Sequence, residues 1–195
     1  MITEFIPDLE RLQKEGKAIN TARLYELTIE NWLRRDEGKH EFSVSHKKRL
    51  MKALAFEVQR RSGEGLSAEE LEEWLDTWLF HHPVIKDAYS NMNRETLKKD
   101  LRTATFIIRE EDQEFSFAHT SLQEYFLAGY LLDALSSPER QDDTLAIPLP
   151  SNETLNFAAE MLALDERLLG RSIKVIERIL ESSYQKELSE LTLAL

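Results

Sequence analysis

The histidines are the residues of this chain whose type best suits chemistry, but their spacing does not form a metal site. The sequence contains five of them, His40, His46, His81, His82 and His119, and it contains no cysteine. No pair has the His-x-x-x-His or His-Glu-x-x-His spacing that presents two imidazoles on one helical face. The absence of cysteine excludes disulfides, thiolate zinc sites, iron–sulfur clusters and cysteine nucleophiles.

Three glycine-containing fragments resemble nucleotide-binding motifs in their letters alone. Residues 63–68 fit Gly-x-Gly-x-x-Ala, but they follow a predicted helix, whereas a dinucleotide fingerprint follows a strand. The Gly-Lys pairs at Gly16 and Gly38 lack the following hydroxyl residue that holds magnesium in a phosphate-binding loop. There is also no Gly-x-Ser-x-Gly elbow. We therefore expect that this chain is not an enzyme and has no catalytic residue, metal or cofactor of its own.

The elements that carry these residues are predicted to be mostly helical. Apolar residues recur at helical spacing over 20–35, 45–61, 67–81, 94–103, 120–135, 151–164, 170–181 and 183–192. Two short stretches rich in β-branched and aromatic residues, 105–109 and 114–118, predict one β-hairpin. The expected fold class is mostly α, with a helical domain, a winged-helix domain that contains the hairpin, and a C-terminal helical segment.

Proline content and charge suggest where the chain divides into domains. Three of the five prolines and a charged run fall within 136–150, which reads as a linker or a long surface loop. The predicted units are an N-terminal helical segment over 1–44, a winged-helix-like domain over 45–135, the linker over 136–150 and a C-terminal helical segment over 151–195. The longest apolar run, 125–132, is far shorter than the ~20 residues of a membrane span, so we expect a soluble protein without membrane contact. The absence of cysteine fits a reducing cytosol, so we expect a cytoplasmic location.

The charge balance bears on the choice of partner. Acidic residues outnumber basic ones by 36 to 25, which gives a formal net charge of −11 and disfavours nucleic acid. An alternative stays open in which the helix over 94–103 reads DNA through Lys98, Lys99 and Arg102. The hairpin tip opposes this alternative through four acids that would face phosphate, Glu110, Glu111, Asp112 and Glu114.

The segment over 115–131, FSFAHTSLQEYFLAGYL, resembles the hallmark of the NACHT family of signal-transduction NTPases. The pattern is an aromatic-x-Phe-x-His, a hydroxyl residue, Gln-Glu-Tyr, and then a helix with small residues and Tyr-Leu. Upstream, residues 23–27 followed by Trp32 and Leu33 resemble the first helical domain of that family. The resemblance covers about Thr21 to Leu135 and implies the winged-helix regulatory portion of such a protein, without its ATPase core.

This resemblance implies a role for His119. In the family, the histidine of the motif contacts the phosphates of bound ADP and holds the protein closed. The sequence lacks the phosphate loop and the acidic magnesium site of the ATPase core, so ADP or ATP with magnesium is implied only for a full-length parent. The residues alone allow two interpretations: an anion contact before a helix N-terminus, or a histidine packed between hairpin and helix.

The resulting functional hypothesis is a regulatory module of a NACHT-type switch, which clamps an ADP-bound ATPase core and acts in bacterial defence, antiviral or stress signalling. The implied partners are an ATPase core on the same or a neighbouring polypeptide and a sensor or repeat region after this chain. Two alternatives stay open, a winged-helix DNA-binding regulator and a ligand-free helical scaffold.

Overall fold

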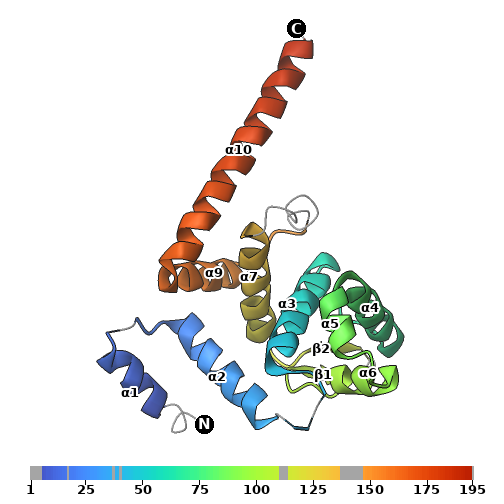
Figure 1. Ribbon diagram of the computed structural model, residues 1–195. Coiled ribbons are helices and arrows are strands. Elements are labelled where there is room, and N and C mark those ends of the chain that lie inside the picture. The colour runs from blue at the N-terminus through green and yellow to red at the C-terminus, as the bar shows by residue number, and fades with distance from the viewer. Residues whose placement is uncertain are drawn as a thin grey trace.

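The computed structural model describes residues 6–16, 18–36, 38–39, 41–109, 114–136 and 147–194 (Figure 1). Its elements in chain order are α1 (Ile6–Lys14), α2 (Thr21–Arg35), α3 (Val44–Arg60), α4 (Ala68–His81), α5 (Pro83–Ala88), α6 (Arg94–Arg102), β1 (Ile107–Arg109), β2 (Phe115–Phe117), α7 (Thr120–Leu135), α9 (Asn152–Leu164) and α10 (Glu166–Ala194). The predicted fold class, mostly helical with one hairpin, is confirmed.

Most helix boundaries follow from local chemistry that the sequence displays. Ser67 accepts a hydrogen bond from the backbone N–H of Glu70, and the Glu70 carboxylate accepts one from the Ser67 N–H, so α4 begins with a capping box of the Ser-x-x-Glu pattern. Helix α4 ends before Pro83 as predicted. Pro83 then begins the unpredicted helix α5, because proline tolerates the first helical turn, where its missing N–H has no partner to lose.

The predicted break between 181 and 183 is wrong, since α10 runs without interruption from Glu166 to Ala194. Serine lowers helix propensity only modestly, and neither proline nor glycine stands at this position. The side chain of Asp165 accepts hydrogen bonds from the N–H groups of Arg167 and Leu168 and so caps the start of this helix. Figure 1 shows α10 extending away from the rest of the molecule.

The hairpin completes a small winged-helix sheet. Strands β1 and β2 pair antiparallel with Ile107 opposite Phe117. Leu66, just before α4, adds an isolated antiparallel bridge, with Phe115 N–H to Leu66 O at 2.7 Å. Gly65 makes this approach possible, because a Cβ there would lie 3.1 Å from the Phe115 carbonyl oxygen. Gly65 of the 63–68 fragment therefore serves chain packing, whereas Gly63 adopts a φ of +91°, which glycine tolerates.

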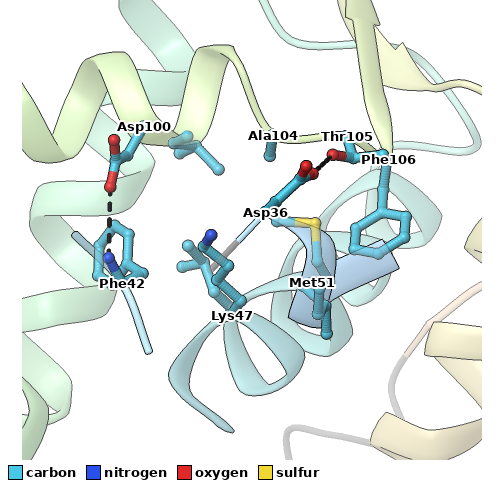
Figure 2. A pocket seen from close by; sticks show the side chains of 11 residues that line it. Asp36, Phe42, Lys47, Met51, Asp100, Ala104, Thr105 and Phe106 are labelled. Carbon is cyan, nitrogen blue, oxygen red and sulfur yellow. Dashed lines mark hydrogen bonds between the residues drawn. The ribbon is translucent and has the colours of Figure 1, made fainter. Parts of the chain in front are cut away.

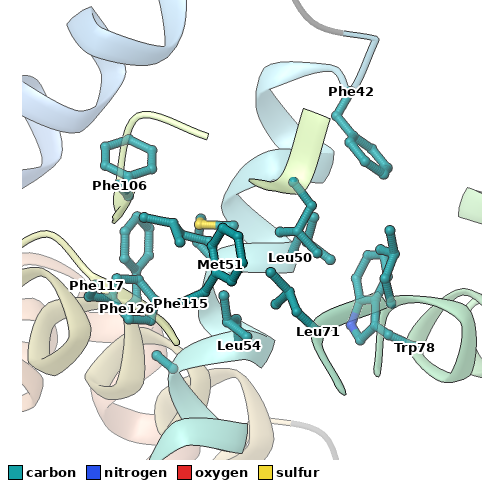
Figure 3. Packing of buried hydrophobic residues seen from close by; sticks show 14 of the residues in the cluster. Phe42, Leu50, Met51, Leu54, Leu71, Trp78, Phe106, Phe115, Phe117 and Phe126 are labelled. Atoms are coloured by element: carbon teal, nitrogen blue, oxygen red, sulfur yellow. The ribbon is translucent and has the colours of Figure 1, made fainter. Parts of the chain in front are cut away.

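A single large apolar cluster joins α2, α3, α4, α6, the hairpin and α7 (Figure 3). Leu50, Leu71, Phe106 and Phe126 are almost completely buried within it. Burial of side chains of this size contributes about 1.5–3 kcal/mol each relative to exposure. The hairpin and the helices around it are thus held by one shared core.

Helix α7 lies between α3 on one side and α9 on the other (Figure 1). Tyr25 of α2, Tyr125 of α7 and Phe157 of α9 form an aromatic cluster, with ring centroids 4.9–5.6 Å apart. The Glu160 carboxylate accepts the Ala22 N–H at 2.7 Å, so α9 also satisfies a backbone donor at the start of α2. Residues on both sides of the predicted linker thus pack together, although most of that linker lies outside the described residues.

No helix within the described ranges is long and apolar enough to cross a bilayer.

Candidate functional site at the start of helix α7

His119 occupies the N-cap position of α7, between strand β2 and the first helical turn. Its backbone is extended (φ −147°, ψ 137°), and its carbonyl oxygen accepts the Leu122 N–H at 3.0 Å. The side chain is exposed and makes no capping hydrogen bond. None of the described residues hydrogen-bonds to the imidazole. The ring is thus not packed between the hairpin and the helix, and it remains available to a ligand.

The backbone on both sides of His119 is held by buried residues. Phe115 and Phe117 of β2 are each 6% exposed, whereas Leu122 and Phe126 on the buried side of α7 are 4% and 1% exposed. The Ala118 N–H donates to the Phe106 carbonyl at 2.8 Å and fixes the chain directly before the histidine. The sequence therefore presents one exposed imidazole on a rigid β-turn-α support.

The start of α7 differs in one respect from the sequence pattern, which places Ser121 and Glu124 in capping-box register. The helix begins at Thr120, so Ser121 lies inside its first turn and cannot cap it. Glu124 instead accepts a hydrogen bond from the Ser151 hydroxyl at 2.7 Å, and Ser151 is the N-cap of α9. The first N–H groups of α7 thus have no side-chain cap at His119, and a helix terminus of this kind favours an anion.

The basic residues of α6 are in a different situation. Lys98 Nζ lies 3.1 Å from Glu72 Oε2, and Arg102 Nη1 lies 2.7 Å from Glu72 Oε1. The hydrogen bond to Glu72 is the main cause of a raised pKa at Lys98. Lys99 is exposed and has no ion pair among the described residues. Two of the three positive charges proposed for DNA contact therefore face α4, and hairpin-tip residues 110–112 lie outside the described residues.

Comparison with known proteins decides the family. A family model described as a winged helix-turn-helix domain C-terminal to NACHT matches residues 21–131, more than half of the chain. The chain belongs to this family. No curated protein and no solved structure matches it.

The match to the NACHT-associated winged-helix domain runs from the first residue of α2 to within α7, so it includes His119, the hairpin and α6. It supports the resemblance drawn from the segment over 115–131. A regulatory module of NACHT proteins is the function class that this membership supports.

The NACHT-associated domain also contains a buried polar cluster that sequence reasoning missed. Asp36 at the end of α2, Lys47 of α3 and Asp100 of α6 are each 7–8% exposed and line a cavity of about 20 Å³ (Figure 2). Asp36 accepts a hydrogen bond from the Thr105 hydroxyl, and Asp100 accepts the Phe42 N–H at 3.3 Å. Three separate helices supply the charges, so no sequence spacing could have revealed the cluster.

The electrostatics of this cluster indicate a structural role. Burial raises the pKa of Asp36, but hydrogen bonds from Thr105 and Lys39 outweigh it, and the net pKa shift is downward. A cavity of this size holds about one water molecule. No group of three His, Cys, Asp or Glu side chains within the described ranges is arranged to hold a metal ion. The Asp100 carboxylate accepts a backbone N–H of the segment between α2 and α3, so the cluster links this segment to α6.

Proposed function

We propose that this chain is the regulatory winged-helix module of a NACHT-type switch and that His119 contacts a phosphate of ADP bound to an ATPase core. The observation that carries the proposal is the imidazole at the N-terminus of α7, which is exposed and has no hydrogen-bond partner among the described residues, within a segment that belongs to the NACHT-associated family. An imidazolium or a neutral imidazole N–H can donate to a phosphate oxygen.

The residues at this position fit half of a phosphate site. The exposed ring and the first N–H groups of α7 offer donors and a positive dipole end, but this sequence contains no phosphate-binding loop and no acidic magnesium site. The other half of the pocket, and the magnesium ion, belong to an ATPase core on the same or a neighbouring polypeptide. The chain itself performs no catalysis in this scheme.

The proposed mechanism is a shift between two populations. A bound ADP that contacts both the core and His119 favours the closed arrangement, and exchange or loss of the nucleotide removes that preference. Helices α9 and α10 connect the module to a sensor or repeat region that follows it. Bacterial defence, antiviral or stress signalling is the setting in which we propose that this cytoplasmic switch acts.

The first experiment titrates ADP into this chain alone and measures the heat of binding by calorimetry. Half a pocket gives weak or undetectable affinity. A micromolar affinity that vanishes in His119→Ala would contradict the division of the site between two segments.

The second experiment adds a NACHT ATPase core and measures how much ADP the purified complex retains. His119→Ala is expected to reduce the retained ADP and to speed its release. His81→Ala is the matched control, since His81 is also exposed at a helix end but hydrogen-bonds to the Thr77 carbonyl. Equal retention by both variants would refute the proposed contact.

A further inference from the structure

A second cavity lies among α3, the end of α4 and the C-terminal half of α7. Its volume is about 70 Å³, which exceeds the space needed for a single water. Three residues from α3, two from the end of α4 and three from α7 line it, namely Arg49, Lys52, Ala53, Trp78, His82, Tyr130, Asp133 and Ala134. Neither the sequence patterns nor the proposed ADP contact gives this cavity a role.

The rim of this cavity has an excess of positive charge. Lys52 Nζ pairs with Asp133 Oδ2 at 2.8 Å, while Arg49 has no acidic partner among the described residues. Arg49 and Lys52 stand three positions apart on α3, so their side chains lie on one helical face. The lining therefore has a local excess of one positive charge, which favours an anion at this place although the chain as a whole has a net charge of −11.

Gly129 leaves room for the Lys52 side chain to pass close to α7. A Cβ at Gly129 would lie 2.8 Å from Lys52 Cε and 3.3 Å from its Nζ. Glycine inside a helix costs about 0.8–1 kcal/mol relative to alanine. The glycine lies where Lys52 passes close to α7, and this passage allows the Lys52 ammonium to reach Asp133 at the edge of the cavity.

Aromatic rings form the walls. The Trp78 and His82 rings stack with centroids 4.4 Å apart, and Tyr130 stacks on Phe56 at 4.5 Å. The charged groups lie at the open side of these walls, since the side chains of Lys52 and Asp133 are 28% and 61% exposed. The Trp78 indole is 7% exposed, and its N–H has no acceptor among the described residues. This indole provides a spectroscopic reporter for the cavity.

We propose that this cavity binds a phosphate group. A phosphate offers three acceptor oxygens and up to two negative charges, which suits the Arg49 guanidinium and the Lys52 ammonium, whose three N–H donors can serve Asp133 and a phosphate together. The cavity, at about 70 Å³, has room for a phosphate group, and any larger part of a ligand would lie outside it. Thr120 and Asp133 are thirteen residues apart on α7, roughly 20 Å at the helical rise, so one diphosphate cannot reach both this cavity and His119.

The test follows the three tryptophan indole N–H signals in ¹H–¹⁵N correlation spectra, with Trp78 assigned by Trp78→Phe. Inorganic phosphate, ADP and succinate are titrated separately at constant ionic strength. Saturable movement of the Trp78 signal with phosphate supports the proposal. Tighter binding of ADP than of phosphate identifies a headgroup carried by a larger molecule, whereas equal or weaker ADP binding identifies the free ion. Saturation by succinate and not by phosphate overturns the assignment.

A matched pair of variants distinguishes a specific phosphate site from nonspecific attraction to positive charge. Lys52 and Lys48 both belong to α3, both make one ion pair at 2.7–2.8 Å, and their side chains are 28% and 30% exposed. Lys52→Gln is expected to weaken phosphate binding about five-fold or more, and Lys48→Gln less than two-fold. Arg49→Gln, an exposed position, gives the same loss as Lys52→Gln with little risk to folding.

Two results overturn the proposal. One is the absence of any saturable change at Trp78 with phosphate or ADP. The other is an equal loss of affinity in Lys48→Gln and Lys52→Gln, which would show only nonspecific charge screening. His119→Ala is expected to leave the phosphate titration unchanged, so the outcome here is independent of the outcome for the ADP contact.

Discussion

The start of α7 and the basic face of α6 both carry residues suited to binding an anion, but the fold leaves the first exposed and places two charges of the second in ion pairs. His119 is exposed and has no hydrogen-bond partner for its ring among the described residues. Lys98 and Arg102 instead share Glu72 of α4. The difference shows that residue type does not by itself make a charge available. An ion pair with a neighbouring helix stabilises the fold and competes with an external ligand.

The largest effect is expected from removal of the support under His119. Phe126→Ala deletes a ring that is 1% exposed and contacts Phe106 and Phe117, so it leaves a cavity beneath the hairpin and α7. We expect a loss of about 3–5 kcal/mol in the free energy of unfolding, measured by urea denaturation. Phe80→Ala, at a position 71% exposed, is the control and should change little.

The second test reverses the charge at two neighbouring positions of α6. Lys98→Glu places a third acid beside Glu72 and Glu95 and should lower Tm by about 2–4 °C. Lys99→Glu, at an exposed position without an ion pair among the described residues, should stay within about 1 °C of the parent. Equal shifts in a thermal unfolding scan would show that the ion pair of Lys98 with Glu72 contributes no more to stability than the exposed charge of Lys99.

The third test uses pH to probe the start of α4, the helix that carries Glu72. Hydrogen bonds from Arg61 and Ser67 lower the pKa of Glu70 from 4.5 to about 2. Since the folded pKa is depressed, the stabilisation is complete above the unfolded pKa and is lost as pH falls toward 2. Glu70→Gln should therefore be less stable than the parent at pH 7, with the gap closing between about pH 5 and pH 2.

Glu69→Gln is the control for this pH profile, because Glu69 is an exposed acid in the same helical turn. Its unfolding midpoint should follow that of the parent across the whole pH series. A gap between Glu70→Gln and the parent that does not narrow in acid would show that charge at Glu70 is not the source of the stability.

A small effect on stability is expected at His119 itself. His119→Ala should change the free energy of unfolding by no more than about 0.5 kcal/mol, because the ring is exposed and makes no hydrogen bond with the described residues. His46→Ala is the comparison, since the His46 ring packs on Tyr89 and its Nδ1 lies 2.7 Å from the Tyr89 hydroxyl. A larger loss at His119 than at His46 would indicate a structural histidine.

No measurable effect is expected on DNA. With Lys98 and Arg102 paired to Glu72, we expect no salt-dependent mobility shift of duplex DNA, for the parent or for Lys98→Glu and Lys99→Glu. A shift in the parent that both variants abolish would favour the DNA-binding alternative over the NACHT switch.

Local sequence signals were sufficient for much of the fold. The capping pair Ser67 and Glu70, the stop before Pro83 and the alternation at Phe115 and Phe117 each lead to the observed element. The short helix α5 and the continuity of α10 were not predicted, because their sequences give no strong local preference. The domain boundaries at 45, 135 and 150 remain predictions.

The candidate sites also differ in whether the sequence alone could reveal them. The histidine of the 115–131 segment could be singled out from its motif, and its position before a helix follows from local spacing. The cluster of Asp36, Lys47 and Asp100 could not be found from the sequence, because its charges come from α2, α3 and α6, which only the tertiary structure brings together. The cavity at Arg49, Lys52 and Trp78 combines α3, α4 and α7 in the same way.

The amino-acid order alone indicated most of the helices, the hairpin and the family, because caps, periodicity and a contiguous motif act over a few neighbouring residues. Only the tertiary structure decided which polar side chains stay available. Exposure of His119, neutralisation of Lys98 by Glu72 and the opening beside Lys52 all depend on distances between helices that are far apart in the chain. Coulomb interactions and desolvation depend on those distances, and sequence separation does not specify them.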